Sequence, residues 1–526
     1  MLPASKETAM PAPSTADFDR LRALVAIDDV EARQSRTIDE VFTGKPLTTI
    51  PVGTAEDVTA AFVKARIAQA QWARRSVKER AAVIERYRDL VVANRGFLMD
   101  VAQAETGKAR SAAQEEIVDI MLNARYYARH AAKLLAPKRV QGLLPGIVKT
   151  VVNHHPKGVV GVISPWNYPM TLSISDAIPA LIAGNAVVVK PDSQTPYCTL
   201  ANAELLYQAG LPRELFAVVP GPGSVVGTAI TAQCDYLMFT GSSATGRTLA
   251  EQCGSRLIGF SAELGGKNPM IVTKGANLPE VAKAATRACF SNAGQLCISI
   301  ERIYVERDIA DEFAEKFAAQ VRDMTLSAAY DFSADMGSLI SEDQIKTISR
   351  HVDDAKVKGA KVIAGGNARP DIGPLFFEPT VLSGVTDEME CSRNETFGPV
   401  VSIYPVDSVE EAIERANDTE YGLNASVWAA SKAQGEEIAA KIKSGTVNVD
   451  EGYALAFGST AAPMGGMKAS GVGRRHGADG ILKYTESQTV STARVLNLDP
   501  PLGISMTLWQ KALTPMIRLV QALPGR

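Results

Sequence analysis

Short apolar runs alternate with helical stretches from residue 158 onward, and this alternation restricts the chain to few folds. The runs GVVGVIS, AVVVK, LFAVVPG and YLMFTG are separated by predicted helices. Parallel strands that are buried on both faces have this continuous apolar character, and helices connect them in βαβ units. Residues 186–262 therefore predict a sheet of the kind that binds nucleotides, and a second α/β series extends from residue 269 to about 449. We expect two open α/β domains.

The segments around these sheets complete the predicted organisation. Capping boxes at Ser76 and Ser111 predict the starts of two amphipathic helices. Residues 140–153 predict a strand pair around a Pro-Gly turn, and residues 483–496 alternate like an exposed edge strand. The predicted parts are a flexible N-terminus at 1–19, a first α/β domain from 20–137 and 157–264, a second from 265–463, a small β element from 138–156 and 482–496, and a C-terminal tail at 497–526.

The amphipathic stretch 503–523 within this tail has three interpretations. It could form a surface helix, cover a neighbouring subunit, or anchor weakly to a membrane. Pro515 interrupts the apolar run and basic residues are few, which favours the surface helix.

The composition narrows the classes of partner. The chain has 55 basic and 58 acidic residues, so it lacks the basic excess of a nucleic-acid-binding protein. Its six cysteines form no CxxC pair and it has five histidines, which argues against a metal site and for a reducing compartment. The first 20 residues lack the apolar core of a signal peptide, and no apolar run reaches the ~20 residues of a membrane span. We expect a cytoplasmic protein without stable membrane insertion, whose partners are small molecules or copies of itself.

Three residues in separate motifs suggest covalent catalysis. Cys297 lies in FSNAGQLCIS, where a lone cysteine is more often a small buried hydrophobe than a nucleophile. Glu263 ends an apolar strand and precedes two glycines, so it projects into the crevice where open α/β sheets bind ligands. Asn167 lies in SPWNYP, where two prolines hold an amide donor on a rigid loop. The other two residues also have structural interpretations. Glu263 could be a solvated carboxylate at a strand end, and Asn167 could be an amide that satisfies its own turn.

Two loops that follow strands have the character of phosphate sites. Lys190 leaves a buried strand in KPDSQTP, and FTGSSATG places small residues at a helix start, where backbone N–H groups attract anions. Both could equally be routine strand-to-helix loops. Residues 221–227 imitate a dinucleotide fingerprint, but they have one residue too many before the third glycine.

The order PWNYP, KPDSQTP, FTGSSATG, ELGGKNP, GQLC and ETFGP resembles the aldehyde dehydrogenase superfamily over residues 38–490. Within that superfamily the chain is most similar to bacterial succinate-semialdehyde dehydrogenases that use NADP. The resemblance implies a cofactor domain, a catalytic domain and a small β oligomerisation element. It also implies that 138–156 and 482–496 build a homodimer or homotetramer, and that no metal is needed.

The resemblance also implies a role for each matching residue. Cys297 is the nucleophile that forms a thiohemiacetal and then a thioester, and Glu263 is the general base. Asn167 and the Cys297 backbone N–H stabilise the oxyanion. The positions implied to contact the nicotinamide cofactor are Trp166, Asn167, Lys190, Ser193, Gly241, Ser242, Leu264, Glu395 and Phe397.

Ser193 bears on the choice of cofactor. NAD-preferring relatives often have a glutamate here, which binds the ribose 2′-hydroxyl and would repel a 2′-phosphate. Ser193 can donate to phosphate and Lys190 adds positive charge, so we expect NADP, with NAD possible because Asp192 is close.

The aldehyde is less constrained. Succinate semialdehyde carries a carboxylate, which an arginine fork holds best. Enzymes of this activity have arginines six residues before the nucleophile and eight after the PWN asparagine, where this chain has Ser291 and Ser175. Ser459 could still bind a carboxylate. We therefore predict succinate semialdehyde from the overall resemblance, with straight-chain or aromatic aldehydes as the alternative.

Two other classes of protein compete with this hypothesis. A thiol acyltransferase or esterase would need a histidine base, and all five histidines lie outside the motifs. An inactive structural homologue would not need the intact Cys297, Glu263 and Asn167.

Overall fold

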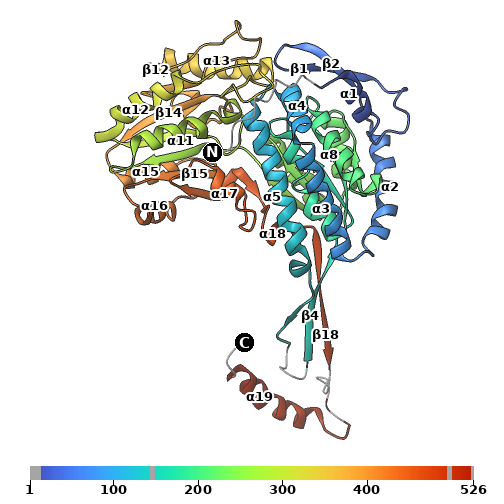
Figure 1. Cartoon of the computed structure of the whole chain (residues 1–526). Helices are drawn as coiled ribbons and strands as arrows, with labels where there is room; N and C mark the ends of the chain where they lie inside the picture. Colours follow the sequence, from blue (N-terminus) through green and yellow to red (C-terminus); the bar gives the residue numbers. More distant parts are fainter. Residues whose placement is uncertain (1–12, 143–147, 494–499, 501, 523–526) are drawn as a thin grey trace.

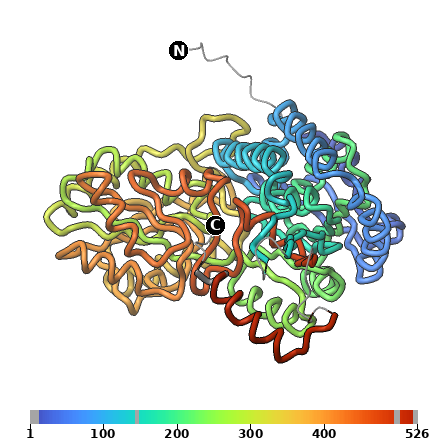
Figure 2. The backbone as a smooth tube through the Cα atoms, turned by 90° about the horizontal axis from the view of Figure 1, so that it is seen from below, coloured from blue at the N-terminus to red at the C-terminus, as the bar shows by residue number. Residues whose placement is uncertain are grey.

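The computed structural model describes residues 13–142, 148–493, 500 and 502–522, with side chains up to residue 519. Two α/β lobes lie side by side, and a β arm extends away from them to a C-terminal helix (Figure 1). Seen from below, residues of the first half of the chain fill one lobe and residues from about 270 to 450 fill the other (Figure 2). Each lobe has its own large hydrophobic core. The prediction of two open α/β domains is confirmed.

The first lobe contains a six-stranded sheet in the order β17-β9-β8-β5-β6-β7. The strands from β9 to β7 in this order are parallel to one another, and β17 runs antiparallel to β9. The chain runs outward from β5 to β6 and β7 and then returns past β5 to β8 on its other side, so the strand order reverses at β5. Open α/β sheets have a crevice at the carboxyl ends of the strands at such a point. The strands are β5 (Val159–Ile163), β6 (Ala186–Lys190), β7 (Phe216–Val218), β8 (Tyr236–Thr240), β9 (Gly259–Glu263) and β17 (Gly471–Val472).

Helices cover both faces of this sheet, and β1 (Ser35–Glu40) and β2 (Lys45–Pro51) form a separate antiparallel pair. The helices are α1 (Thr15–Arg22), α2 (Ala55–Trp72), α3 (Val77–Ala93), α4 (Arg95–Thr106), α5 (Arg110–Leu134), α6 (Pro169–Leu172), α7 (Ala177–Ala183), α8 (Pro196–Gln208), α9 (Thr228–Gln233), α10 (Ser243–Ser255) and α18 (Asp479–Leu482), with short turns η1 (Arg213–Leu215) and η2 (Gly223–Gly227).

The second lobe contains a seven-stranded sheet in the order β12-β13-β14-β11-β10-β15-β16, in which only β12 is antiparallel to its neighbour. Its strands are β10 (Asn268–Val272), β11 (Ile300–Glu306), β12 (Lys361–Ala364), β13 (Thr380–Ser383), β14 (Val400–Val406), β15 (Asn424–Trp428) and β16 (Thr446–Val449). Its helices are α11 (Leu278–Phe290), η3 (Ser291–Gly294), α12 (Arg307–Arg322), α13 (Glu342–Val357), α14 (Glu390–Arg393), α15 (Val409–Asn417), α16 (Lys432–Ala439), α17 (Ala454–Gly458) and η4 (Lys468–Ser470).

The chain crosses from one sheet to the other within four residues. Strand β9 ends at Glu263, and β10 begins the second sheet at Asn268. The segment that contains the two glycines of ELGGK is therefore the connection between the lobes, and it places Glu263 at their boundary.

Two predicted helix starts have different outcomes. Ser76 caps α3 with the predicted box, in which its side chain accepts from the Glu79 backbone. The box at Ser111 is wrong, because α5 begins at Arg110 and Ala109 is its N-cap. The prediction of a flexible N-terminus up to residue 19 is also wrong at its end, because α1 begins at Thr15 with a capping box made by Ser14. Residues 1–12 of that prediction lie outside the described part of the chain.

The arm is an antiparallel sheet of β3 (Lys138–Val140), β4 (Val148–Pro156) and β18 (Thr485–Ala493), in the order β18-β4-β3. Strand β18 pairs with β4 along its whole length and forms one edge of the sheet. The predicted Pro-Gly turn falls at residues 145–146, which lie outside the described residues.

The C-terminal stretch forms helix α19 (Met506–Ala522) at the far end of the arm, with Pro515 inside it (Figure 1). Apolar side chains of this helix are exposed, among them Leu508 and Ile517. Within the described residues, no helix combines the length and the apolar character that a membrane crossing needs.

Candidate active site

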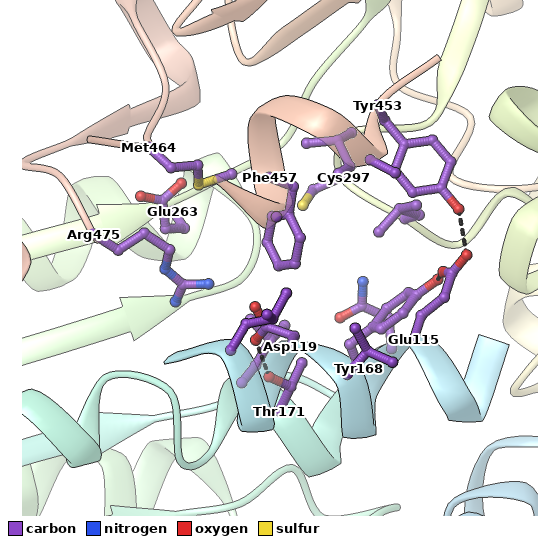
Figure 3. Close-up of a pocket in the computed structure, with 18 of the residues that line it drawn as sticks. Glu115, Asp119, Tyr168, Thr171, Glu263, Cys297, Tyr453, Phe457, Met464 and Arg475 are labelled. Atoms are coloured by element: carbon purple, nitrogen blue, oxygen red, sulfur yellow. Dashed lines mark hydrogen bonds between the residues drawn. The ribbon is translucent and has the colours of Figure 1, made fainter. Parts of the chain in front are cut away.

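A cavity of about 440 Å³ between the lobes brings together the three residues predicted for catalysis. Cys297, Glu263 and Asn167 all line it, although they lie up to 130 positions apart in the sequence. Figure 3 shows the Cys297 sulfur between Glu263 on one side and Tyr453 on the other. The volume lies in the range of ordinary small-molecule sites.

Cys297 is held on a loop of unusual backbone conformation. Asn292, Ala293 and Gly294 have φ values of 51°, 54° and 70°, which place three consecutive residues in the left-handed region. A Cβ atom on Gly294 would lie 2.1 Å from the Gly398 carbonyl oxygen, so only glycine fits there. The Asn268 side chain donates to the Cys297 carbonyl at 2.8 Å and fixes the loop from β10.

The Cys297 thiol differs from the other five thiols in its exposure. It is partly exposed, whereas all of the others are buried. Burial of its surroundings, together with the carboxylates of Glu263 and Glu395, raises its pKa to about 12. The thiol is therefore protonated near pH 7 in this state, and a nucleophilic role requires a base to remove its proton.

Glu263 has the properties of such a base. Its side chain is 5% exposed, and its Oε2 atom has no hydrogen-bond partner among the described residues. Burial raises its pKa to about 7, although Arg475 and Lys483 act in the opposite direction. A carboxylate with a pKa near the working pH can both accept and release a proton.

Asn167 is fixed by its backbone and its side chain. Its carbonyl accepts from Lys108 Nζ at 2.8 Å and from Asn292 Nδ2 at 3.0 Å. Its own Nδ2 donates to the Gln295 carbonyl at 3.0 Å, two residues before the nucleophile. An amide nitrogen has two N–H groups, so this bond leaves a second donor on a residue that lines the same cavity as Cys297.

The predicted cofactor positions fall into two groups. Lys190, Ser193, Gly241 and Ser242 lie at the carboxyl ends of β6 and β8 and do not line the Cys297 cavity. Lys190 is buried, which lowers the pKa of its amine, and its Nζ donates to the Pro191 carbonyl at 2.6 Å.

Ser193, Gly241 and Ser242 form hydrogen bonds within the first lobe. The Ser193 hydroxyl donates to the Gly221 carbonyl at 3.2 Å, so the imitation fingerprint lies directly beside Ser193. Ser242 caps α10 by accepting from the Thr245 N–H at 3.3 Å. The Gly241 N–H donates to the Glu263 carbonyl at 3.1 Å and links the loop after β8 to the end of β9.

The second group lies at the boundary between the lobes. The rings of Trp166 and Phe397 meet edge to face, with centroids 5.4 Å apart. Glu395 Oε1 accepts from the Gly266 N–H at 2.9 Å, and burial raises the Glu395 pKa to about 8. Leu264 is buried and its N–H donates to the Ser470 carbonyl at 2.9 Å.

The structure also places in the cavity several residues that sequence reasoning missed. One face of helix α5 lines the cavity, with its residues at helical spacing. Polar residues at this spacing were the sequence signal that could have indicated this face. Arg475 is 4% exposed, contacts Asp176 in an ion pair, and lies on the same side of the cavity as Glu263 in Figure 3. Among the missed residues are Ser111, Gln114, Glu115, Val118, Asp119, Leu122, Arg287, Tyr453, Phe457 and Arg475.

The serines at the expected arginine positions contact carboxylates instead. Ser175 donates to Asp119 at 2.8 Å, and Ser291 donates to Glu115 at 3.3 Å. Ser459 does not line the cavity, and its hydroxyl donates to the Leu455 carbonyl at 2.8 Å. The described residues contain no cluster of side chains that could hold a metal ion.

The two α/β lobes and the cysteine–carboxylate–amide cavity between them define an aldehyde-oxidising enzyme. A family model described as "Aldehyde dehydrogenase family" matches residues 28–490, and the chain belongs to this family. The predicted resemblance is confirmed, and the protein is an aldehyde dehydrogenase rather than a thiol acyltransferase or a structural homologue.

The chain is similar to named relatives over nearly its whole length. It is 84% identical to a Mycolicibacterium smegmatis protein over 517 residues, which are 98% of this chain and 100% of that one. That protein is named "Putative succinate-semialdehyde dehydrogenase", with NADP(+) as its coenzyme. A Mycobacterium tuberculosis protein of the same description is 75% identical over the same share of each chain. A Bacillus cereus aldehyde dehydrogenase solved in complex with NAD+ has 34% identity and a TM-score of 0.83, covering 88% of this chain and 93% of that one.

Proposed function

We propose that the protein oxidises succinate semialdehyde to succinate with NADP. The cavity that holds Cys297, Glu263 and Asn167 supports the reaction type. The observation that supports this particular substrate is the 84% identity to the M. smegmatis protein of that description.

The Cys297 sulfur attacks the aldehyde carbon while its thiol proton passes to a base. Because the thiol pKa is about 12, the proton must leave as attack occurs, and the unpartnered Glu263 Oε2 is the acceptor in the cavity. The carbonyl oxygen becomes an oxyanion in the thiohemiacetal. The second N–H of the Asn167 amide and the Cys297 backbone N–H stabilise it, and each such donor is worth ~10²–10³ in rate.

Glu263 acts again when the thioester is hydrolysed. It takes a proton from a water molecule, which attacks the thioester carbon. The C–S bond then breaks to release the acid, and the proton held by Glu263 passes to the departing Cys297 sulfur, which restores the thiol. The buried position of Glu263 keeps its pKa near 7, so that it can release the thiol proton to solvent before it takes a proton from water.

The residues at the carboxyl ends of β6 and β8 fit a nicotinamide dinucleotide. When it is bound, the nicotinamide accepts a hydride from the thiohemiacetal carbon. Lys190 and Ser193 would hold the adenosine ribose and its 2′-phosphate, and Gly241 and Ser242 would face the pyrophosphate at the start of α10. The Lys190 amine is buried, and among the described residues its hydrogen-bond acceptor is the adjacent Pro191 carbonyl, which supports this placement.

The nicotinamide end would lie at the boundary between the lobes. Trp166, Asn167, Leu264, Glu395 and Phe397 are the residues that would contact the nicotinamide riboside. The comparison of kcat/KM for NADP and NAD tests the cofactor choice, and a clear preference for NAD would refute it.

Oxidation of uncharged aldehydes is a second candidate that one observation favours. Ser175 and Ser291 replace the expected arginines and bind the carboxylates of Asp119 and Glu115. A kinetic panel of succinate semialdehyde, butanal and benzaldehyde decides between the two. Higher kcat/KM for the uncharged aldehydes would refute the semialdehyde proposal.

We further infer a cytoplasmic homodimer or homotetramer that assembles through the arm. Strand β18 is an edge strand with most of its side chains exposed, and such an edge is a ready template for pairing with another chain. Light scattering on the purified protein measures the subunit number, and a monomer would contradict the inference.

A further inference from the structure

A substrate that carries a carboxylate needs a cation in the cavity besides the reacting groups. Among the residues that line the cavity, the cations are Arg287 and Arg475. They lie on different elements, and their surroundings differ, so the structure allows a choice between them.

Arg475 already pairs with a carboxylate of the protein. It is 4% exposed and forms an ion pair with Asp176, which also pairs with Lys483 at 2.9 Å. In Figure 3 its guanidinium lies on the same side as Glu263, away from Glu115 and Tyr453. A substrate carboxylate placed there would lie beside Glu263 and disfavour the ionised form of the base.

Arg287 lies in the last turn of α11 and remains accessible. Its side chain is 55% exposed, and Nη2 donates to Glu115 Oε1 at 3.2 Å. The guanidinium carbon lies 5.4 Å from the centre of the Tyr453 ring, and this face contact fixes its plane. Because a guanidinium has five N–H donors, the Glu115 bond leaves a fork for a second carboxylate.

Arg287 is not the only donor to Glu115, because three hydroxyl groups also donate to this carboxylate. Oε1 accepts from the Tyr453 hydroxyl at 2.7 Å and from Arg287, while Oε2 accepts from the Tyr168 hydroxyl at 3.2 Å and from Ser291 at 3.3 Å. Three of these donors are neutral hydroxyl groups that stabilise the carboxylate. Glu115 thus orients Arg287 at the cavity, and the three hydroxyl groups stabilise the negative charge of Glu115.

We propose that Arg287 binds the carboxylate of the aldehyde substrate, with Glu115 and Tyr453 as the residues that position it. The inference rests on the proposed succinate semialdehyde activity. The four carbons of that substrate extend about 4 Å, from ordinary C–C bond lengths. A molecule of this length is small enough for the 440 Å³ cavity, which both Cys297 and Arg287 line. Figure 3 shows Tyr453 and Glu115 on the wall opposite Glu263 and Arg475, with the Cys297 sulfur between the two walls.

The test compares Arg287→Ala with Lys283→Ala. Lys283 is an exposed cation one turn earlier on α11 that does not line the cavity, so it controls for long-range attraction of anions. We expect Arg287→Ala to raise KM for succinate semialdehyde by about 10- to 100-fold, the range for a lost charge-assisted hydrogen bond, with a small change in kcat. Lys283→Ala should leave KM within about twofold. Arg287→Lys should restore part of the loss, because it keeps the charge without the fork.

Butanal separates a carboxylate site from a structural role. We expect its kcat/KM to be the same in wild type and Arg287→Ala, whereas equal losses for both aldehydes would show that Arg287 only holds the cavity wall and would overturn the proposal. Succinate inhibition of butanal oxidation gives an independent readout. Its inhibition constant should rise about tenfold or more in Arg287→Ala, and an unchanged constant would also overturn the proposal.

The two proposals fail in different ways. If the wild type oxidises butanal better than succinate semialdehyde, the proposed function is wrong. If the wild type prefers succinate semialdehyde and Arg287→Ala keeps that preference, the function stands and the assignment of Arg287 is wrong.

Discussion

Replacing Glu263 by glutamine removes the base without removing a hydrogen bond made by its side chain. The Glu263 side chain is 5% exposed, and its Oε2 has no partner among the described residues. The isosteric Glu263→Gln change should therefore leave the fold intact. It should lower kcat by ~10²–10⁴, the usual worth of general-base catalysis.

The pH dependence of the wild type follows from the same residue. With a pKa of about 7, the Glu263 carboxylate is ionised in about one molecule in eleven at pH 6 and in about ten in eleven at pH 8. The ionised form is the active base, so kcat should rise about tenfold from pH 6 to pH 8 when hydrolysis of the thioester limits the rate. The Glu263→Gln variant should lose this rise.

Steady-state kcat is measured from pH 6 to pH 8, with NADPH formation followed by absorbance. Rapid mixing then measures the first turnover separately. The melting temperature of Glu263→Gln provides the control for folding. A wild-type kcat that is constant over this range, or a Glu263→Gln kcat equal to that of the wild type, would refute the assignment of Glu263 as the base.

Three further predictions concern the neighbouring residues. Asn167→Ala should lower kcat/KM by ~10²–10³ through loss of an oxyanion donor, and steady-state kinetics showing less than a twofold change would contradict that role. Ser193→Glu should lower the ratio of kcat/KM for NADP over NAD by at least about tenfold, because a carboxylate repels the 2′-phosphate; an unchanged ratio would remove Ser193 from the cofactor site. Lys108 and Glu116 form a fully buried ion pair at 2.5 Å. Lys108→Met should lower the free energy of unfolding by about 3–5 kcal/mol, measured in denaturant, because it leaves the carboxylate of Glu116 unpaired. Adding Glu116→Gln should recover part of this loss, and no recovery would contradict the electrostatic cause.

The sheets and the catalytic residues could be predicted because their signals are local. Continuous apolar runs mark strands buried on both faces, and each of Cys297, Glu263 and Asn167 has a distinctive motif around it. The candidate carboxylate site has no such motif. Arg287 on α11, Glu115 on α5 and Tyr453 before α17 come together only because the two lobes pack against each other.

The starts of α5 and α1 could not be predicted from the local sequence, because contacts with distant parts of the chain determine them. Helix α4 ends at Thr106, and Gly107 after it has a φ of 68° that turns the chain. The following residue, Lys108, is buried against Glu116. These two constraints start α5 at Arg110, before the apparent capping box at Ser111. In the N-terminal segment, Phe18 is buried and packs edge to face on Tyr197 at 4.9 Å, and this contact stabilises a helix that composition alone would not suggest.

The late position of β17 and β18 in the chain has a consequence for biosynthesis. Strand β9, which carries Glu263, is paired on its outer side by Gly471–Val472, and β4 is paired by Thr485–Ala493. A ribosome releases both partners only after about nine-tenths of the chain has been made, since synthesis runs from the N-terminus. Until then the first lobe has an open strand edge beside its future catalytic base. Chains that terminate early should therefore be inactive and prone to edge-to-edge association, so that activity is present only in completed polypeptides.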